Sequence, residues 1–240
     1  MTQLPNGRGL LLPVTALAGG HGIGDFGPAA RALVEQLAAG GYVAWQTLPL
    51  TAPGRGDSPY STRSGNCLAT VTISLDDLVE VGLLTGRETA RVGRPEGPTQ
   101  FAATAAAKQP LLQRAAQAYA TEAPSRIEAE LTPQRRDDAR FAYNAQVHGS
   151  TNWWAWPSIH EPPSSWLLRA VALQSIAEQQ WQRLRDCAGR AGVTIFGDLP
   201  LYVDHASADV WAHPNAFLLD EKGRMLAQAG VPPDAFSETG

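Results

Sequence analysis

The segment "TAPGRGDSPY" combines residue types that suit the binding of a sugar. Gly54 and Gly56 let the backbone turn tightly, Ser58 and Tyr60 present hydroxyl groups, and Tyr60 adds a flat aromatic face. The segment follows "WQTLPL", which reads as a strand, and loops that follow the strands build the active site in α/β barrels. A tight loop in which Tyr60 only packs gives the same spacing, so both interpretations stay open.

Asp198 is the second candidate, because it lies in "GDLP" directly after the apolar run "VTIF". A carboxylate at the end of a strand can accept hydrogen bonds from the hydroxyl groups of a neutral sugar. The alternative is structural, since a carboxylate at this position can also cap nearby backbone amides. Among the acidic residues, position and surroundings make Asp198 the strongest candidate for contact with a ligand.

The glycine-rich segment "GHGIGDFG" has the spacing G-x-G-x-x-G, with Gly22, Gly24 and Gly27 just before a predicted helix. A dinucleotide-binding fingerprint requires these glycines to follow the first strand immediately, and it requires an acidic residue near the end of the second strand. Pro13 to Gly20 separates the strand from the glycines, and "YVAWQTLPL" has no carboxylate. The sequence therefore does not predict a nicotinamide cofactor.

Metal ligation is not expected either. The candidate ligands are His205 and His213, with Asp204 and Asp209 nearby. Their spacing matches no helical two-histidine motif. The two cysteines, Cys67 and Cys187, are too far apart in sequence for a zinc ribbon or a disulfide framework, so we expect two ordinary thiols.

Composition limits the class of partner. With 240 residues, of which 44% are hydrophobic and 18% charged, the chain can bury one large core or two modest ones. A formal net charge of −4 does not favour binding to the negatively charged backbone of nucleic acid. No apolar run is long enough to span a bilayer. The start, "MTQLPNGRGLLLPV", lacks the basic region of a secretory signal. We therefore expect a cytoplasmic protein with a neutral partner, and neither nucleic acid nor a membrane as partner.

The first part of the chain reads as strand, helix, strand. The apolar run 9–13 predicts a strand, and a helix begins at Pro28 and stops at Gly40 and Gly41. "YVAWQTLPL" then reads as a strand that is buried on both faces.

A second helix and strand follow later in the chain. Ser164 or Ser165 can cap a long helix with apolar residues at helical spacing, and Gly192 ends it. The strand "VTIFGDLPLYV" follows directly. Strands that alternate with amphipathic helices predict an α/β protein, either a barrel or a doubly wound sheet.

The stretch between these two parts has a different character. It is alanine-rich and helical in propensity, with a break expected at Pro110. We predict a start of the main α/β domain over 1–51, an inserted, mainly helical subdomain over 52–163, and a continuation of the main domain over 164–240.

Taken together, these segments resemble the successive landmarks of a known family. They are "GLLLPVTAL", "GGHGIGDFG", "WQTLPL", "GRGDSPY", "QQWQRLR", "GVTIFGDLPLYVDHASADVWAHPNAFLLDEKG" and "AGVPPDAFSETG". They look like those of the 4-α-glucanotransferases, the amylomaltase or disproportionating-enzyme family, from Gly9 to Gly240 and most densely from Gly192 onward. The resemblance implies a (β/α)8 barrel of the TIM-barrel type with inserted subdomains, of which this chain carries the first three or so β/α units. It also implies action on α-1,4-glucans and maltooligosaccharides without a cofactor.

In that family the chemistry is a retaining double displacement, with an aspartate nucleophile, a glutamate acid/base and a second aspartate that stabilises the distorted ring. By resemblance, these three carboxylates belong to motifs that come after "GVPPDAFSETG", so no catalytic residue is expected in this chain. The resemblance thus suggests the N-terminal portion of a 4-α-glucanotransferase that is inactive alone. The alternative is a catalytically silent relic or a glucan-binding fragment.

The resemblance also assigns individual residues to substrate binding. Ser58 and Tyr60 match the "DSPY" positions near the bound sugars, and Asp198 matches the aspartate of the "GD-P" motif. In the final segment, the positions that match the loop over the glucan are Pro233, Asp234 and Phe236. The chain departs from the family pattern at Ala235, where an aromatic residue is usual, and over Asn66 to Thr70, where "NCLAT" replaces "FAGNP".

Overall fold

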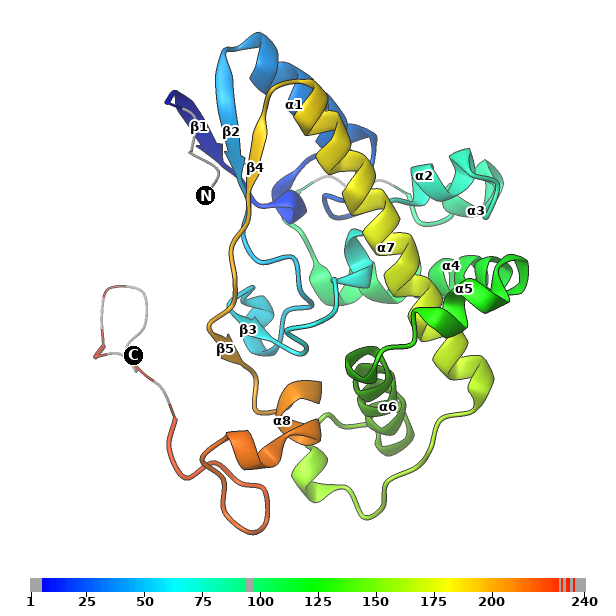
Figure 1. Ribbon diagram of the computed structural model, residues 1–240, viewed down its shortest axis with the longest axis vertical. Coiled ribbons are helices and arrows are strands. Elements are labelled where there is room, and N and C mark those ends of the chain that lie inside the picture. Colours follow the sequence, from blue (N-terminus) through cyan, green and yellow to red (C-terminus); the bar gives the residue numbers. More distant parts are fainter. Residues whose placement is uncertain (1–5, 94–96, 229, 231, 234, 236–240) are drawn as a thin grey trace.

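A parallel sheet lies at the N-terminal end of the fold. The computed structural model describes residues 6–93, 97–228, 230, 232–233 and 235. Within them the sheet has the strand order β1-β2-β4, and both pairings are parallel. Figure 1 shows α1 and α7 lying along this sheet. The bounds are Arg8–Leu11 for β1, Pro28–Ala39 for α1, Tyr42–Gln46 for β2, Ser164–Arg190 for α7 and Thr194–Phe196 for β4. The predicted alternation of strands and helices is therefore confirmed in these segments.

Helix α1 packs on the sheet through one apolar face. Pro28 occupies its first turn, where the missing N–H costs no hydrogen bond, and Ala30, Val34 and Leu37 recur at helical spacing and are buried. The helix ends at Ala39, and Gly41 follows with a φ of 71°, which favours glycine. The start and stop of this helix agree with the sequence prediction.

The prediction that "YVAWQTLPL" is buried on both faces is only partly right: Trp45 is fully buried, whereas the other residues of β2 are partly buried, and the neighbouring strands leave one face open. Leu10, Trp45 and Ile195 lie in register and pack in the core under α1 and α7. Side chains alternate between the faces of a sheet, so the next residues in register, Leu11 and Phe196, point the other way. Leu11 is 56% exposed and Phe196 44% exposed, because no described segment covers that face.

The predicted single strand "VTIFGDLPLYV" is wrong. Strand β4 ends at Phe196, and Tyr202–Val203 forms β5, which pairs in parallel with β3 (Ser61–Thr62) in a separate sheet. Gly197 and Pro200 explain the break. Glycine weakens a strand, and proline lacks the N–H that a central strand would donate.

Helices are the main secondary structure of the segment 52–163, and the proposed boundaries of the three parts stay predictions. In chain order the remaining helices are α2 (Leu75–Glu80), α3 (Gly86–Thr89), α4 (Phe101–Glu122), α5 (Pro124–Ala129), α6 (Pro133–His148) and α8 (Ala208–Ala212). Short 3-10 turns are η1 (Val14–Ala16), η2 (Arg55–Asp57), η3 (Thr70–Thr72), η4 (Trp153–Ala155) and η5 (Pro214–Ala216).

Two details of the helix predictions need correction. Helix α4 continues through Pro110 instead of breaking there. The missing hydrogen bond is offset by packing, since Leu112, Ala115 and Ala116 of the next turns are buried. Helix α7 begins at Ser164, and neither serine caps it with its side chain, because Pro163 occupies the N-cap position and both serines already lie in the first turn.

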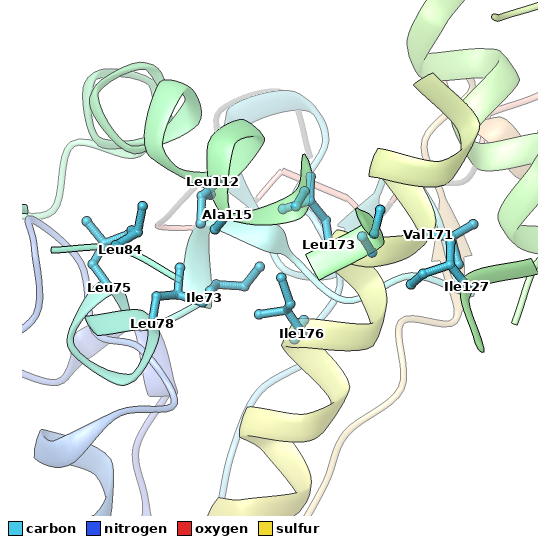
Figure 2. Close-up of a cluster of buried hydrophobic side chains, with 14 residues drawn as sticks. Ile73, Leu75, Leu78, Leu84, Leu112, Ala115, Ile127, Val171, Leu173 and Ile176 are labelled. Carbon is cyan, nitrogen blue, oxygen red and sulfur yellow. The ribbon is translucent and has the colours of Figure 1, made fainter. Parts of the chain in front are cut away.

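Helix α7 joins the two parts of the core. Its first half contributes Val171 and Ile176 to a cluster with α2, α4 and α5 (Figure 2). Its second half contributes Leu184 and Ala188 to the cluster beneath the sheet, which contains Trp45. In Figure 1 it is the long yellow helix that runs from the sheet to the helical part. Helix α7 therefore links the sheet to the helical part through a packed interior.

Candidate functional site

The two residues singled out at strand ends meet in the structure. The Tyr60 hydroxyl donates a hydrogen bond to Asp198 Oδ2 at 2.7 Å, across 138 positions of sequence. Tyr60 comes from the loop after β2 and Asp198 from the segment after β4, as parallel strands require of residues that share one edge. The pairing of β3 with β5, visible in Figure 1, holds these two segments side by side.

A cavity of about 540 Å³ opens beside this contact. Its lining residues are Tyr60, Gly197, Asp198, Leu199, Leu201 and Tyr202. The cavity therefore combines two aromatic rings with a single carboxylate and two apolar side chains. Such a mixture suits a neutral ligand that has both apolar ring faces and hydroxyl groups.

The electrostatics fix the direction of the Tyr60 hydrogen bond. The hydrogen bond to Asp198, with some desolvation, raises the pKa of Tyr60 above its ordinary value. The phenol therefore stays protonated at neutral pH and donates. Asp198 accepts a second bond, since its Oδ1 accepts from the Leu199 amide at 2.8 Å. The structure thus gives Asp198 both features considered from sequence, a contact at a cavity and a cap on a backbone amide.

Ser58 lies in the turn that leads to Tyr60. Its Oγ accepts from the Tyr60 amide at 3.3 Å, a local turn that orients the next residues, and Ser58 is not part of the cavity lining. Its role in ligand binding stays a prediction.

Of the C-terminal candidates, Asp234 and Phe236 lie outside the described residues. Pro233 is described and exposed, and the structure does not bring it to the cavity of Tyr60 and Asp198.

Tyr202, Leu199 and Leu201 line the cavity, although no sequence pattern predicts this role for them. Tyr202 is 64% exposed, and Leu199 and Leu201 are 79% and 88% exposed. The apolar run "GDLPLYV" reads as part of a buried strand, and only Pro200 within it signals a segment that leaves the sheet.

The acidic residues near the histidines serve as acceptors for the backbone. Asp209 Oδ2 accepts from the Gly65 amide at 2.9 Å, and its Oδ1 accepts from Asn66 Nδ2 at 2.9 Å. The His205 ring stacks on Trp154, with centroids 4.0 Å apart, and its Nε2 lies 2.7 Å from the Gly223 carbonyl oxygen. Across the described part of the chain, no three His, Cys, Asp or Glu side chains are grouped in a way that could hold a metal ion.

The glycines of "GHGIGDFG" permit close packing. A Cβ on Gly24 would lie 2.0 Å from the Val14 carbonyl oxygen, and one on Gly27 would lie 2.1 Å from Ser74 Oγ. Asp25, between them, is buried and accepts from the Gly27 amide at 2.9 Å. These contacts give the glycines a role in packing the loop, and no dinucleotide is needed to explain them.

Both cysteines are free thiols, as the sequence predicts. Cys67 is buried, and burial is the main cause that raises the pKa of its thiol. No helix in the described residues is both long and apolar enough for a membrane span.

A parallel α/β sheet whose strand ends carry polar and aromatic side chains around a cavity is typical of α/β proteins that bind small ligands at that edge of the sheet. Residues 12–240 match the family model described as 4-alpha-glucanotransferase. The chain therefore belongs to this family.

Individual relatives agree with that assignment. The chain is 37% identical to "4-alpha-glucanotransferase, chloroplastic/amyloplastic" of Solanum tuberosum, over 98% of the chain and 46% of that protein. It is 36% identical to the 4-alpha-glucanotransferase of Thermus thermophilus, over 99% of the chain and 51% of that protein. Its fold matches an amylomaltase from Streptococcus agalactiae in complex with acarbose, with a TM-score of 0.89 and 29% identity over 97% of the chain and 51% of that one. The chain thus spans about half the length of the relatives it matches.

Proposed function

We propose that the chain forms a glucan-binding part of a 4-α-glucanotransferase, which transfers segments of α-1,4-glucan between maltooligosaccharides. The observation that carries the proposal is the contact between Tyr60 and Asp198 beside a cavity of about 540 Å³. Membership of the family supports the reaction class. The residue roles rest on the geometry of the cavity.

The cavity can hold a sugar without any charge on the ligand. Ligand pockets typically enclose about 300–1,000 Å³, so this one has room for at least one sugar ring. The exposed rings of Tyr60 and Tyr202 offer apolar faces for stacking, and Asp198 offers carboxylate oxygens as acceptors for sugar hydroxyls. We assign the stacking role to Tyr60 and the acceptor role to Asp198.

The sheet supports the finer prediction of a (β/α)8 barrel. In the described residues β2 lies between β1 and β4, and the outer edges of β1 and β4 have no partner strand in that sheet. The face that carries Leu11 and Phe196 is exposed, whereas parallel sheets are normally covered on both faces. We infer that further strands continue this sheet and turn the exposed face into the interior of a barrel.

The proposed mechanism is a retaining double displacement, and this chain is expected to be silent on its own. Such a mechanism needs two carboxyl groups about 5–5.5 Å apart, one as nucleophile and one as acid/base. Among the described residues, Asp198 is the single carboxylate that lines the cavity. The purified chain should therefore release no glucose from maltotriose, and a measurable steady rate would contradict this assignment.

Calorimetric titration with acarbose and with maltotriose tests the binding site directly. Asp198→Asn should weaken binding by about tenfold or more, because a charged acceptor typically contributes about 1.5–3 kcal/mol to a hydrogen bond. Tyr60→Phe keeps the ring and Tyr60→Ala removes it, so the second should be clearly weaker if stacking is the role. In a full-length enzyme, the same changes should lower kcat/KM for transfer in the same order.

Asp220→Asn is the matched control. Asp220 Oδ1 accepts from the amides of Lys222 and Arg224 at 2.8 Å each, much as Asp198 caps Leu199, but Asp220 is not part of the cavity. Its substitution should leave binding unchanged. If Asp198→Asn lowers the melting temperature while the folded protein binds with normal affinity, then Asp198 is only a backbone cap and the assignment fails.

A further inference from the structure

The loops that carry Tyr60 and Asp198 are tied together just beyond these residues. Strand β3 begins at Ser61, directly after Tyr60, and pairs with β5 through Ser61 with Tyr202 and Thr62 with Val203. The ladder ends at Asp204, whose amide donates to the Thr62 carbonyl at 2.8 Å. Because this sheet has only two residues in each strand, its pairing alone is a weak support.

The side chain of Asp204 adds a second connection at the same point. Its Oδ2 accepts from Ser61 Oγ at 3.3 Å, and its Oδ1 accepts from the Ala206 amide at 2.8 Å. One carboxylate thus fixes the turn after β5 and the first residue of β3. Tyr60 is bonded covalently to that residue.

The packing around Ser61 leaves no room for movement toward Gly54. The Gly54 amide donates to the Ser61 carbonyl, and Gly54 is buried. A Cβ at this position would lie 2.6 Å from the Ser61 carbonyl oxygen and 2.7 Å from Asp204 Oδ2. Glycine is therefore required here for the close approach of the two loops.

Tyr60 itself has little else to hold it. Its side chain is 45% exposed, and the contact with Asp198 is exposed as well. An exposed aromatic side chain that must stack on a ligand binds better when its backbone is already ordered, because less conformational entropy is lost on binding.

We propose that Asp204 is a positioning residue, which holds Ser61 and thereby sets Tyr60 in the orientation that contacts Asp198 and a bound glucan. The part of this inference that concerns glucan rests on the function proposed above. The part that concerns the orientation of Tyr60 is independent of any ligand and can be measured without one.

The first measurement follows Tyr60 in the unliganded chain. With 13C-labelled tyrosine, the chain gives signals from five residues, and Tyr60→Phe identifies the one from Tyr60. Asp198→Ala then defines the position of that signal when the hydrogen-bond acceptor is lost. Asp204→Ala should move the Tyr60 signal toward that position, whereas Asp204→Asn keeps an acceptor oxygen and should largely restore it.

A second variant, at Gly54, disturbs the contact between Asp204 and Ser61 without changing either residue. Gly54→Ala should move the Tyr60 signal in the same direction, because its Cβ would displace Ser61 and Asp204. Gly65→Ala is the matched control, since a Cβ there meets its nearest atom at 3.6 Å, an ordinary contact. Asp220→Ala controls for the loss of a loop carboxylate. If Asp204→Ala does not fold, Gly54→Ala and Asp204→Asn still decide the question.

The second measurement is acarbose affinity in a double-mutant cycle. Asp204→Ala should weaken binding about threefold to tenfold, roughly the net contribution of one ordinary hydrogen bond, and should cost nothing further in the Tyr60→Ala background. Equal losses in both backgrounds would overturn the proposal, as would an unmoved Tyr60 signal in folded Asp204→Ala. If the wild-type chain binds neither acarbose nor maltotriose, the proposed function fails, while the Tyr60 signal still tests the role of Asp204.

Discussion

Lys108 leads to the sharpest prediction from this structure. It belongs to α4, its side chain is fully buried, and its Nζ donates to the carbonyl oxygens of Val71 and Ile73 at 2.5 and 2.7 Å. Burial disfavours the ammonium form and lowers the pKa of Lys108 from 10.5 to about 8, although the carboxylate of Asp25 opposes part of that effect. The stability of the fold should therefore increase with pH in the alkaline range.

The sign and size follow from proton linkage. Between about pH 8 and 10.5 the unfolded chain holds a proton on Lys108 that the folded chain has released. The free energy of unfolding should therefore increase with pH across this window. At about 1.4 kcal/mol for each pKa unit, the contribution of Lys108 to that increase is about 3 kcal/mol. The neutral amine can still donate to both carbonyls, so the packing is retained.

The sequence makes the assay simple, because Lys108 and the exposed Lys222 are its two lysines. Urea unfolding at several pH values should show the increase in the wild type and in Lys222→Met, and should lack it in Lys108→Met. With 13C-labelled lysine, the Lys108 signal should titrate near pH 8, and Asp25→Asn should lower its pKa further. If Lys108 titrates near 10.5, or if Lys108→Met keeps the full pH dependence, the account of a buried ammonium is wrong.

Three further predictions concern stability. Gly24→Ala places a Cβ 2.0 Å from the Val14 carbonyl oxygen and should lower the melting temperature strongly, whereas Gly189→Ala on the open side of α7 should stabilise by about 0.5–1 kcal/mol. Arg31→Lys should lower the free energy of unfolding in urea by about 1–3 kcal/mol. Arg31 donates two hydrogen bonds of 2.8 Å to the buried carboxylate of Asp77, and lysine cannot reproduce both. Burial raises the pKa of Asp138 from 3.8 to about 6, so the free energy of unfolding of the wild type should fall as pH rises through this window. Asp138→Asn should not show that fall when unfolding is measured at pH 4 and pH 7.

Local patterns predicted the elements of the fold well where one face alone had to be buried. Helix α1 follows from Pro28, the spacing of its apolar residues and the glycines after it, and α7 ends before Gly192, which has a φ of 73°. The burial of the strands could not be predicted in the same way. An apolar run shows that a residue can be buried, but whether Leu11 or Phe196 is covered depends on distant segments.

In the site too, local patterns predicted the position of residues along the chain but not the contacts between distant segments. Strand-end position was enough to predict that Tyr60 and Asp198 lie at the same edge of the sheet, because parallel strands place their following loops there. No local pattern could predict their hydrogen bond, the two carbonyl oxygens that hold Lys108, or the contact of Asp204 with Ser61. Each of these pairs is separated by more than 30 positions, and each depends on how two loops or a helix and a loop meet.

The segment after β4, whose apolar pattern predicts a continuous strand, is the one that lines the cavity. Had "VTIFGDLPLYV" continued as one strand, the side chains after Phe196 would alternate between the faces of a sheet and would be held by its hydrogen bonds. Pro200 cannot donate such a bond, so the chain leaves the first sheet at Gly197 and joins β3 only at Tyr202. The residues between are free of either ladder. Asp198 can therefore turn toward Tyr60, and Leu199 and Leu201 can line the cavity instead of a core. The break in the strand places a carboxylate, an aromatic ring and apolar side chains around one opening, which is the combination that a neutral glucan would need.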